Sequence, residues 1–395
     1  MHIEAIELKN FRAFKHIKMQ DIPKFCIIVG ANGTGKSTIF QVFNFLKDAM
    51  SDNVQTALAK LGGGLGFKEV RTRNCSGSIE IIIKFRIEID KPLCTYHLEI
   101  DEEEGQPIVV REVLSYRRGP RGKPWQFLNF RRGSGTAITN ELAEIIDDTK
   151  LDRVEHTLKA KNILAIKGLS QFETFPAVKA LGDLIQNWHI SDFHITNARY
   201  ENPYDFAEHL SKDGDNLSSV TDYLYKNHPQ VFKAILNGLS HRVPGIADVE
   251  TKITEEGRVL LKFRDGAFED PFLARHVSDG TIKMLAYLIL LYDPKPHPLL
   301  CVEEPENQLY PKLLTELAEE FRLYSQRGGQ VFVSTHSPEF LNAAKLNEVF
   351  WLVKKSGFTD IKRANTDKQI SEYMQDGDQL GYLWQQGFFE NVDPQ

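Results

Sequence analysis

Apolar and polar residues alternate along several stretches in the first third of the chain. In "IEIIIKFRIEID", from Ile79 to Asp90, apolar side chains occupy every second position, and Ile82 is the one exception on the polar face. "IEAIELKNF" near the start shows the same alternation, and "TYHLEI" and "IVVREVLSYR" follow as further strands. A period of two is typical of half-buried strands. Residues 79–118 therefore predict an antiparallel lobe.

Other stretches follow different patterns. "FCIIV", residues 25–29, is apolar throughout, as expected of a strand covered on both faces, and a helix is predicted from Gly35 to about Met50. Residues 140–240 read as mostly helical and polar, without a sustained heptad repeat. Residues 248–265 return to strands. From His276 onward, helices alternate with the apolar strands "PLLCV", "QVFVST" and "EVFWLV", which predicts an α/β arrangement.

Composition narrows the class of protein. The 395 residues have a net charge of −6, so any contact with nucleic acid or an anionic membrane must come from a local patch. The four cysteines, which lack metal-like spacing, are expected to be buried, reduced thiols. Charges interrupt the N-terminus where a signal peptide needs an apolar run, and no window approaches 18 uninterrupted apolar residues. We expect a soluble, cytoplasmic protein without membrane contact.

The turn after "FCIIV" has the spacing of a phosphate-binding loop. Gly30 to Ser37 fits the pattern GxxxxGK[ST], between an apolar strand and a helix. Glycines let backbone N–H groups converge on phosphate oxygens, and the helix start adds positive potential. Lys36 would reach the β- and γ-phosphates, and the Ser37 hydroxyl would bind Mg²⁺. The predicted ATP-binding residues are Gly30, Ala31, Asn32, Gly33, Thr34, Gly35, Lys36, Ser37 and Thr38.

A second acidic motif follows a later apolar strand. "HPLLCVEEPENQLYP" places Glu303 and Glu304 at the end of a short apolar run, where open α/β sheets bind their ligands. Glu303 would hold Mg²⁺ through water, and Glu304 would activate the attacking water as a general base. An acidic surface turn would give the same four letters, "EEPE", but the preceding buried strand favours function.

These motifs, in this order, resemble the ABC-type ATPase heads of the RecF, SMC and Rad50 group. The resemblance rests on Gly30 to Ser37, "HVSDGTIKMLAYL", "CVEEPENQLYP" and "VFVSTHSPEFL", and on the opening "IELKNFRAF". It is strongest to stand-alone prokaryotic predicted AAA-family ATPases that are related to the overcoming-lysogenization-defect (OLD) ATPases. It implies an α/β P-loop NTPase fold with an antiparallel β lobe, an inserted helical region and no long coiled coil.

The resemblance also implies roles for single residues. Ser278, Asp279 and Gly280 match a short signature motif, which in this family contacts the γ-phosphate bound by another subunit. His336 in "STHSP" matches the switch histidine that senses the γ-phosphate. The remaining matches are Gln171, a candidate magnesium-coupling glutamine, and Arg12, a candidate phosphate contact whose alternative is a surface salt bridge.

The chain departs from the family pattern at one carboxylate. Glu303 stands where many members have aspartate, although its longer side chain can still reach Mg²⁺. Because each chain would carry half of each ATP site, a homodimer closed around two ATP molecules is implied.

The resemblance divides the chain as follows. Residues 1–395 would form a single head, with an N-terminal P-loop part (1–60), an antiparallel β lobe (61–135), a helical insertion (136–247) and a C-terminal part (248–395) with signature, carboxylates and switch histidine. The segment after His336 is too short for an appended Toprim nuclease domain. A nuclease-like effector is therefore expected on a separate chain.

A local basic stretch lies between Arg111 and Arg132, where a single acid, Glu112, occurs and Trp125, Phe127 and Phe130 are interleaved. It is open to three interpretations: a nucleic-acid surface, a solvated hairpin with packing aromatics, or a docking surface for an acidic partner. The candidate patch residues are Arg117, Arg118, Arg121, Lys123, Arg131 and Arg132.

Two classes of function remain open. In the first, an ATPase that dimerises around ATP acts on DNA or gates a separate nuclease-like effector, in prokaryotic anti-phage or anti-plasmid defence. In the second, a nucleotide-gated regulator controls a toxic partner without binding DNA. The resemblance also leaves a DNA repair ATPase open. An ABC transporter ATPase is disfavoured, because the P-loop arrives early and the signature is short.

Overall fold

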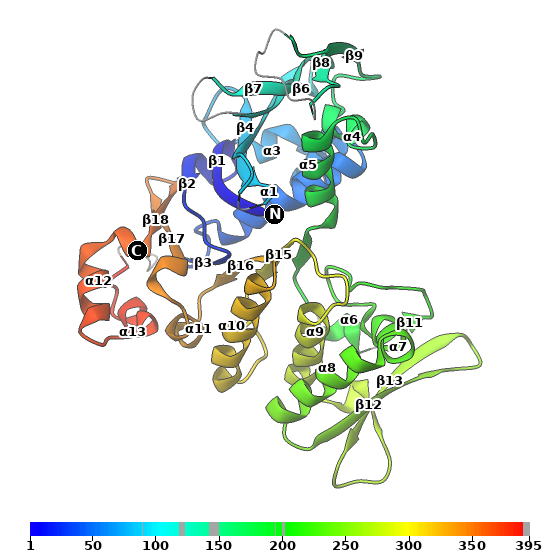
Figure 1. The fold of residues 1–395 in the computed structure, drawn as a ribbon. Helices are drawn as coiled ribbons and strands as arrows, with labels where there is room; N and C mark the ends of the chain where they lie inside the picture. The colour runs from blue at the N-terminus through cyan, green and yellow to red at the C-terminus, as the bar shows by residue number, and fades with distance from the viewer. Residues whose placement is uncertain (89, 118–122, 142–149, 194, 200–201, 390–395) are drawn as a thin grey trace. The chain divides into compact units, whose positions relative to one another are not determined.

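The computed structural model describes residues 1–88, 90–117, 123–141, 150–193, 195–199 and 202–389. The chain forms two compact units (Figure 1). Unit 1 comprises Met1–Trp188 and Lys345–Gln395, and unit 2 comprises His189–Ala344.

An eight-stranded antiparallel sheet forms much of unit 1. The period-two pattern holds in β4 (Ile79–Arg86), where buried and half-buried residues alternate without exception, although the strand ends before Asp90. The strand order is β2-β1-β4-β5-β6-β7-β8-β9. The other strands are β1 (His2–Phe11), β2 (Phe14–Met19), β5 (Cys94–Glu103), β6 (Gln106–Tyr116), β7 (Trp125–Arg131), β8 (Ser134–Ile138) and β9 (Arg153–Thr157).

A second sheet region of unit 1 carries the apolar strand predicted at 25–29. β3 (Phe25–Val29) is buried at every position and pairs in parallel with β17 (Val349–Lys355), which pairs antiparallel with β18 (Phe358–Arg363). Burial on both faces explains why β3 has no alternation. The helices of unit 1 are α1 (Lys36–Ser51), α2 (Val54–Gly62), α3 (Phe67–Val70), α4 (Ala165–Leu169), α5 (Pro176–Asn187), α12 (Lys368–Gln375) and α13 (Leu380–Gln385).

A buried carboxylate ties the antiparallel sheet to α4. Glu112 of β6 is fully buried, and its oxygens accept hydrogen bonds from the N–H groups of Ala165 and Ile166 and from the Tyr96 hydroxyl. Burial raises the pKa of Glu112 to about 7, and these hydrogen bonds oppose the rise. Glu112 therefore belongs to the core of the lobe and is not part of a charged surface.

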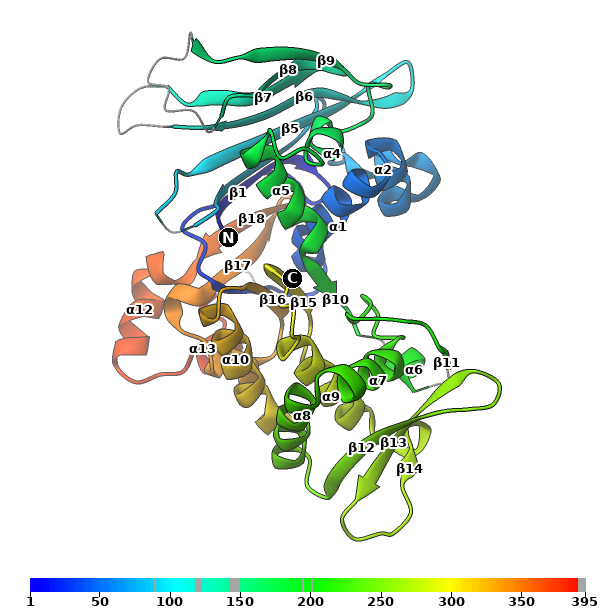
Figure 2. The ribbon, with the colours of Figure 1, turned by 45° about the vertical axis from the view of Figure 1, so that its right-hand side comes forward.

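Unit 2 contains the three parallel strands β10 (His189–Ser191), β15 (Leu299–Glu303) and β16 (Gln330–Thr335) and a four-stranded antiparallel sheet (Figure 2). β15 pairs in parallel with β10 on one side and β16 on the other. α7 and α8 pack against the antiparallel strands β12 and β13. These elements are β11 (Asn202–Pro203), β12 (Ile246–Ile253), β13 (Arg258–Asp265), β14 (Phe272–Leu273), α6 (Ile195–Ala198), α7 (Leu217–Asn227), α8 (Pro229–Arg242), α9 (Asp279–Leu291), α10 (Pro311–Gln326) and α11 (Pro338–Asn342).

The predicted helical range, the cysteines and the predicted absence of membrane spans differ in how well they agree with these elements. The range 136–247 contains the expected helices, but also β9, which extends the antiparallel sheet, and β10, which joins the parallel one. Near the end of the described residues, Phe389 packs on its own unit, because its ring lies 5.3 Å from that of Trp351 in β17. Cys26, Cys94 and Cys301 are buried as expected, whereas Cys75 is only partly buried. Among the described residues, no helix is both long and apolar enough to span a membrane.

Candidate nucleotide site

The glycine-rich turn of unit 1 forms a closed loop between β3 and α1. The Thr34 hydroxyl donates to the Ala31 carbonyl oxygen at 2.8 Å, and the Thr34 N–H donates to the same oxygen at 3.3 Å. Gly30 cannot be replaced without movement, since a Cβ there would lie 2.4 Å from the Thr34 hydroxyl oxygen. A side chain at the first glycine of the turn would therefore force the Thr34 side chain to move.

Lys36 lies across this loop. Its ammonium group donates to the carbonyl oxygen of Gly30 at 2.8 Å and to that of Ala31 at 3.4 Å. The side chain is buried, whereas Asn32 and Ser37 are exposed. The positive charge and the start of α1 therefore lie together, as anion binding requires, because the first-turn N–H groups of a helix have no acceptor within the helix.

The loop is also held from β18. The hydroxyl of Thr359, which is 3% exposed, donates to the Thr34 carbonyl oxygen at 2.7 Å. The Thr359 N–H donates to the carbonyl oxygen of Ala13, which follows β1. Thr359 lies 325 residues from Thr34, so no local motif could have identified it.

Arg12 lies in the turn between β1 and β2. Its backbone has a positive φ of 50°, and its guanidinium donates to the Leu61 carbonyl oxygen at the end of α2. Burial lowers the pKa of Arg12, and the nearby Glu69 opposes this. Arg12 lines a hollow of about 370 Å³ together with Glu69, Arg71, Arg73 and Lys354. Its assignment as a phosphate contact stays a prediction.

The acidic motif of unit 2 lies at the end of β15. Four of the five strand residues are buried, and Glu303 is opposite Ser334 in the register with β16. The Glu304 N–H donates to the Ser334 carbonyl oxygen, although Glu304 has a positive φ of 40°. A left-handed backbone is costly for glutamate, and such strain persists where the surroundings enforce it, which is common at functional sites.

His336 meets two carboxylates just beyond β16. Its Nδ1 atom lies 3.5 Å from an oxygen of Glu304 and 3.3 Å from one of Glu306. Glu306 holds this loop in place, because its Oε1 atom accepts from the Thr335 hydroxyl at 2.7 Å and from the His336 N–H at 2.8 Å. The Glu304 carboxylate, predicted as a base, thus lies beside the predicted switch histidine.

The signature residues begin α9 in the same unit. The Ser278 hydroxyl caps the helix by accepting from the Thr281 N–H. Asp279 forms an ion pair with Arg199, and a Cβ on Gly280 would lie 2.9 Å from the carbonyl oxygen of Gln308. The signature turn therefore packs closely on the segment that follows the carboxylates.

Three further residues of unit 2, Asp192, Lys283 and Glu306, lie with Glu304 and His336 and were not predicted from the sequence. Lys283 of α9 is 3% exposed; burial lowers its pKa to about 8, against the attraction of Glu306, Asp192 and Glu304. Asp192 directly follows β10, the parallel neighbour of β15. The available signals were weak: one lysine in the otherwise apolar stretch "TIKMLAYLILL", a third glutamate in "EEPE", and an aspartate after a short apolar segment.

Two other predictions fall elsewhere. Gln171 lies in the turn after α4 of unit 1, where its N–H donates to the Gly168 carbonyl oxygen and its side chain is exposed. The assignment of Gln171 to a magnesium site stays a prediction.

The basic stretch is less continuous than its sequence indicates. Phe127 and Phe130 are each 1% exposed and pack inside the lobe, so they cannot stack on bases as the first interpretation requires. Arg132 pairs with Glu103, which also binds Lys161. Arg117, Lys123 and Arg131 are exposed, whereas Arg118 and Arg121 lie outside the described residues.

Comparison with known proteins identifies the family. Residues 25–342 match the family described as "AAA domain, putative AbiEii toxin, Type IV TA system". The chain belongs to this family. It is also 22% identical over 412 residues to the Old nuclease of Escherichia phage P2, and the match covers 96% of this chain and 64% of that protein. A 45-residue stretch is 53% identical to the chromosome partition protein Smc of Methanocaldococcus jannaschii, covering 11% of this chain and 4% of that one.

Two solved structures share the fold. One is the SMC head bound to the C-terminal winged-helix domain of ScpA, with a TM-score of 0.55, 16% identity, and coverage of 92% of this chain and 97% of that one. The other is an SMC head with an extended coiled coil, bound to the C-terminal domain of ScpA derived from Pyrococcus furiosus, with a TM-score of 0.52, 15% identity, and coverage of 95% and 99%. The chain therefore shares the fold of SMC-type ATPase heads and is similar in sequence to an OLD protein, as the sequence motifs predicted.

Proposed function

We propose that this protein binds ATP with Mg²⁺ and hydrolyses it to ADP and phosphate. The observation that carries the proposal is the Gly30–Lys36 loop, in which the buried Lys36 ammonium lies over the loop carbonyls at the start of a 16-residue helix. A closed loop, a fixed cation and a helix start together favour a chain of phosphates. The membership in an AAA family supports the same conclusion.

Each motif has a role in this reaction. Lys36 and the first turn of α1 hold the β- and γ-phosphates. Glu304, beside His336, accepts a proton from the attacking water, a contribution of roughly 10² to 10⁴ in rate. His336 would donate a hydrogen bond to the γ-phosphate. Because His336 also contacts Glu306, binding or loss of the γ-phosphate would change the position of both residues.

The oxygen donors suit magnesium. Mg²⁺ prefers hard oxygen ligands and retains several waters. Ser37 offers an exposed hydroxyl at the start of α1, and Glu303 offers a carboxylate at a strand end. The bound ion would neutralise phosphate charge and orient the γ-phosphate.

We further propose that two chains close around two ATP molecules, each chain contributing its signature turn to the nucleotide of the other. Ser278 and the start of the 13-residue helix α9 offer a hydroxyl and free helix N–H groups to the γ-phosphate. ATP then stabilises the closed dimer, and hydrolysis releases it.

The cellular role is proposed in two forms. In one, the closed dimer acts on DNA or gates a nuclease-like effector in defence against phage or plasmids; the relative named Old nuclease supports it. In the other, the dimer controls a toxic partner without DNA. The burial of Phe127 and Phe130 and the pairing of Arg132 favour the second form, as does the word toxin in the family description. A cytoplasmic location is expected for either.

The test is light scattering on Glu304→Gln with and without ATP and Mg²⁺, beside Lys36→Ala. We expect an ATP-dependent rise in dimer for Glu304→Gln and none for Lys36→Ala. Hydrolysis by the unaltered protein, measured as phosphate release, must be slowed in both variants. A protein that releases phosphate but shows no ATP-dependent dimer would overturn the shared-site proposal and leave the ATPase intact.

A second experiment separates the two roles. Arg117→Ala, Lys123→Ala and Arg131→Ala are combined in one variant, because these cations are exposed. Lost DNA binding and lost stimulation of ATP hydrolysis by DNA would support the first role. No DNA binding by the unaltered protein would exclude it.

A further inference from the structure

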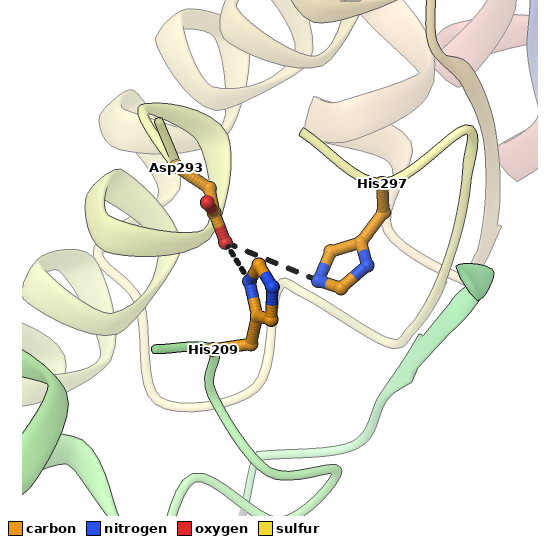
Figure 3. Close-up of side chains that lie close together, drawn as sticks. All are labelled: His209, Asp293 and His297. Carbon is orange, nitrogen blue, oxygen red and sulfur yellow. Dashed lines mark hydrogen bonds and ion pairs between the residues drawn. The ribbon is translucent and has the colours of Figure 1, made fainter. Parts of the chain in front are cut away.

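Three side chains that can bind a metal ion meet in unit 2, away from the carboxylates at the end of β15. His209 comes from the segment between β11 and α7, and Asp293 and His297 come from the connection between α9 and β15 (Figure 3). The His209 Nδ1 atom lies 2.6 Å from Oδ2 of Asp293, and the His297 Nε2 atom lies 4.0 Å from the same oxygen. One ligand atom from each residue lies within 4.8 Å of the other two.

The group is well buried but open on one side. The side chains of Asp293 and His297 are 7% and 11% exposed, whereas that of His209 is 36% exposed. Figure 3 shows the two imidazoles directed at the Asp293 carboxylate from different segments of the chain. An ion at the centre would therefore be shielded by protein yet reachable by water at the His209 side.

Both segments are held in place by contacts outside the three ligands. The second oxygen of Asp293 accepts from the Lys295 N–H at 2.8 Å, and the His209 carbonyl oxygen accepts from the Asn216 side chain at 2.9 Å. The Lys295 ammonium pairs with Glu208 at 2.6 Å, which joins the two segments a second time. Such supporting contacts fix ligand orientation before a metal arrives.

We propose that His209, Asp293 and His297 form a binding site for one divalent transition-metal ion of the zinc type. Two imidazole nitrogens and one carboxylate oxygen suit zinc, whereas Mg²⁺ and Ca²⁺ prefer oxygen ligands alone. Bonds of about 2.0–2.2 Å place tetrahedral ligand atoms roughly 3.3 Å apart. Binding would replace the hydrogen bond between His209 and Asp293, widen that pair slightly and bring the His297 ring closer.

The site lies in the connection between α9 and β15, so a bound ion would affect both elements. Asp293 follows the end of α9, the helix that begins after Ser278, and His297 precedes β15, the strand that ends at Glu303. A bound ion would fix the connection between the signature helix and the carboxylate strand, and would tie it to the segment before α7. We therefore expect the metal to stabilise unit 2.

The experiment measures zinc binding by the full chain, without nucleotide. The protein is stripped with a chelator, dialysed against a range of Zn²⁺ concentrations, and assayed for bound metal by mass spectrometry. The variants are His209→Gln, Asp293→Asn and the control His241→Gln, which changes an exposed histidine at the end of α8. Substitution with Co²⁺ reports coordination directly, through the visible absorption of a four-coordinate ion.

We expect one Zn²⁺ per chain in the unaltered protein and in His241→Gln, and at least tenfold weaker binding in His209→Gln and Asp293→Asn. Zn²⁺ should raise the unfolding temperature of the first two proteins only, and Mg²⁺ should not replace it. If Asp293→Asn fails to fold, the half-exposed His209→Gln decides the result. Equal zinc binding by His209→Gln and the unaltered protein, or no zinc binding by either, would overturn the site and leave His209 and Asp293 as a hydrogen-bonded pair.

Discussion

The glycine-rich loop of unit 1 and the carboxylate cluster of unit 2 are built in opposite ways. The loop is made mainly of backbone atoms from a few consecutive residues, closed by Thr34 and Lys36. The cluster is made of side chains from α9 and from the segments that follow β10, β15 and β16, which are far apart in sequence. The loop can therefore be recognised in the sequence as a motif, whereas the cluster forms only when these elements pack together.

The largest expected effect is on Lys36, which supplies the charge of the loop. Lys36→Ala should lower ATP hydrolysis by roughly 10³-fold or more and should also weaken ATP binding, because no other atom of the loop carries a positive charge. Phosphate release and nucleotide titration measure the two effects. Lys24→Ala, at an exposed lysine before β3, is the control and should change neither. Unchanged hydrolysis in Lys36→Ala would refute the loop as the phosphate site.

A smaller effect is expected at Glu306, which positions His336 and Thr335 without belonging to the loop. Glu306→Ala should lower hydrolysis by about 10²-fold and leave ATP binding nearly unchanged, since it removes the acceptor that holds the histidine loop. Glu306→Gln keeps an acceptor oxygen and should recover most of the rate. If both variants lose ATP binding as Lys36→Ala does, the proposed division between binding and hydrolysis fails.

Glu112 offers a comparison inside unit 1, because it is a side-chain anion held by the first N–H groups of α4. Its folded-state pKa of about 7 exceeds the ordinary value of 4.5. The folded chain thus binds more protons between these values, and the free energy of unfolding falls as pH rises through that window. The fall attributable to Glu112 should be roughly 2–3 kcal/mol.

Denaturant unfolding at several pH values from 4.5 to 7.5 measures this effect in the unaltered protein and in Glu112→Gln. The variant cannot ionise, so the difference between the two curves isolates Glu112 from other groups. Parallel curves would show that the carboxylate is not destabilised by burial.

The smallest effect is expected at Thr359, a side chain distant in sequence that supports the glycine-rich loop. Thr359→Val keeps the shape but removes the hydrogen bond to the Thr34 carbonyl oxygen, at a cost of about 1 kcal/mol in unfolding free energy. ATP should bind more weakly by a few-fold at most. Thr359→Ser keeps the hydroxyl and should behave like the unaltered protein; an equal loss in both variants would assign the effect to packing.

Much of the fold was predictable because it depends on local patterns. The period-two stretch at β4 and the uniformly apolar β3 follow from burial on one or two faces of a sheet. Strand β9 was missed, since "RVEHT" has one apolar residue and is largely exposed. Its place is fixed by pairing with β8 rather than by its own composition.

The candidate sites divide in the same way. By itself the sequence determined the Gly30–Ser37 loop, the carboxylates at a strand end and the family, because their chemistry requires certain residues at fixed spacing along the chain. Only the tertiary structure placed Lys283 and Glu306 near Glu304, buried Phe127 and Phe130 within the lobe, and brought His209 to Asp293 and His297. Side chains that are distant in sequence meet through packing and strand register. Neither packing nor register can be predicted from the local periodicity of the sequence.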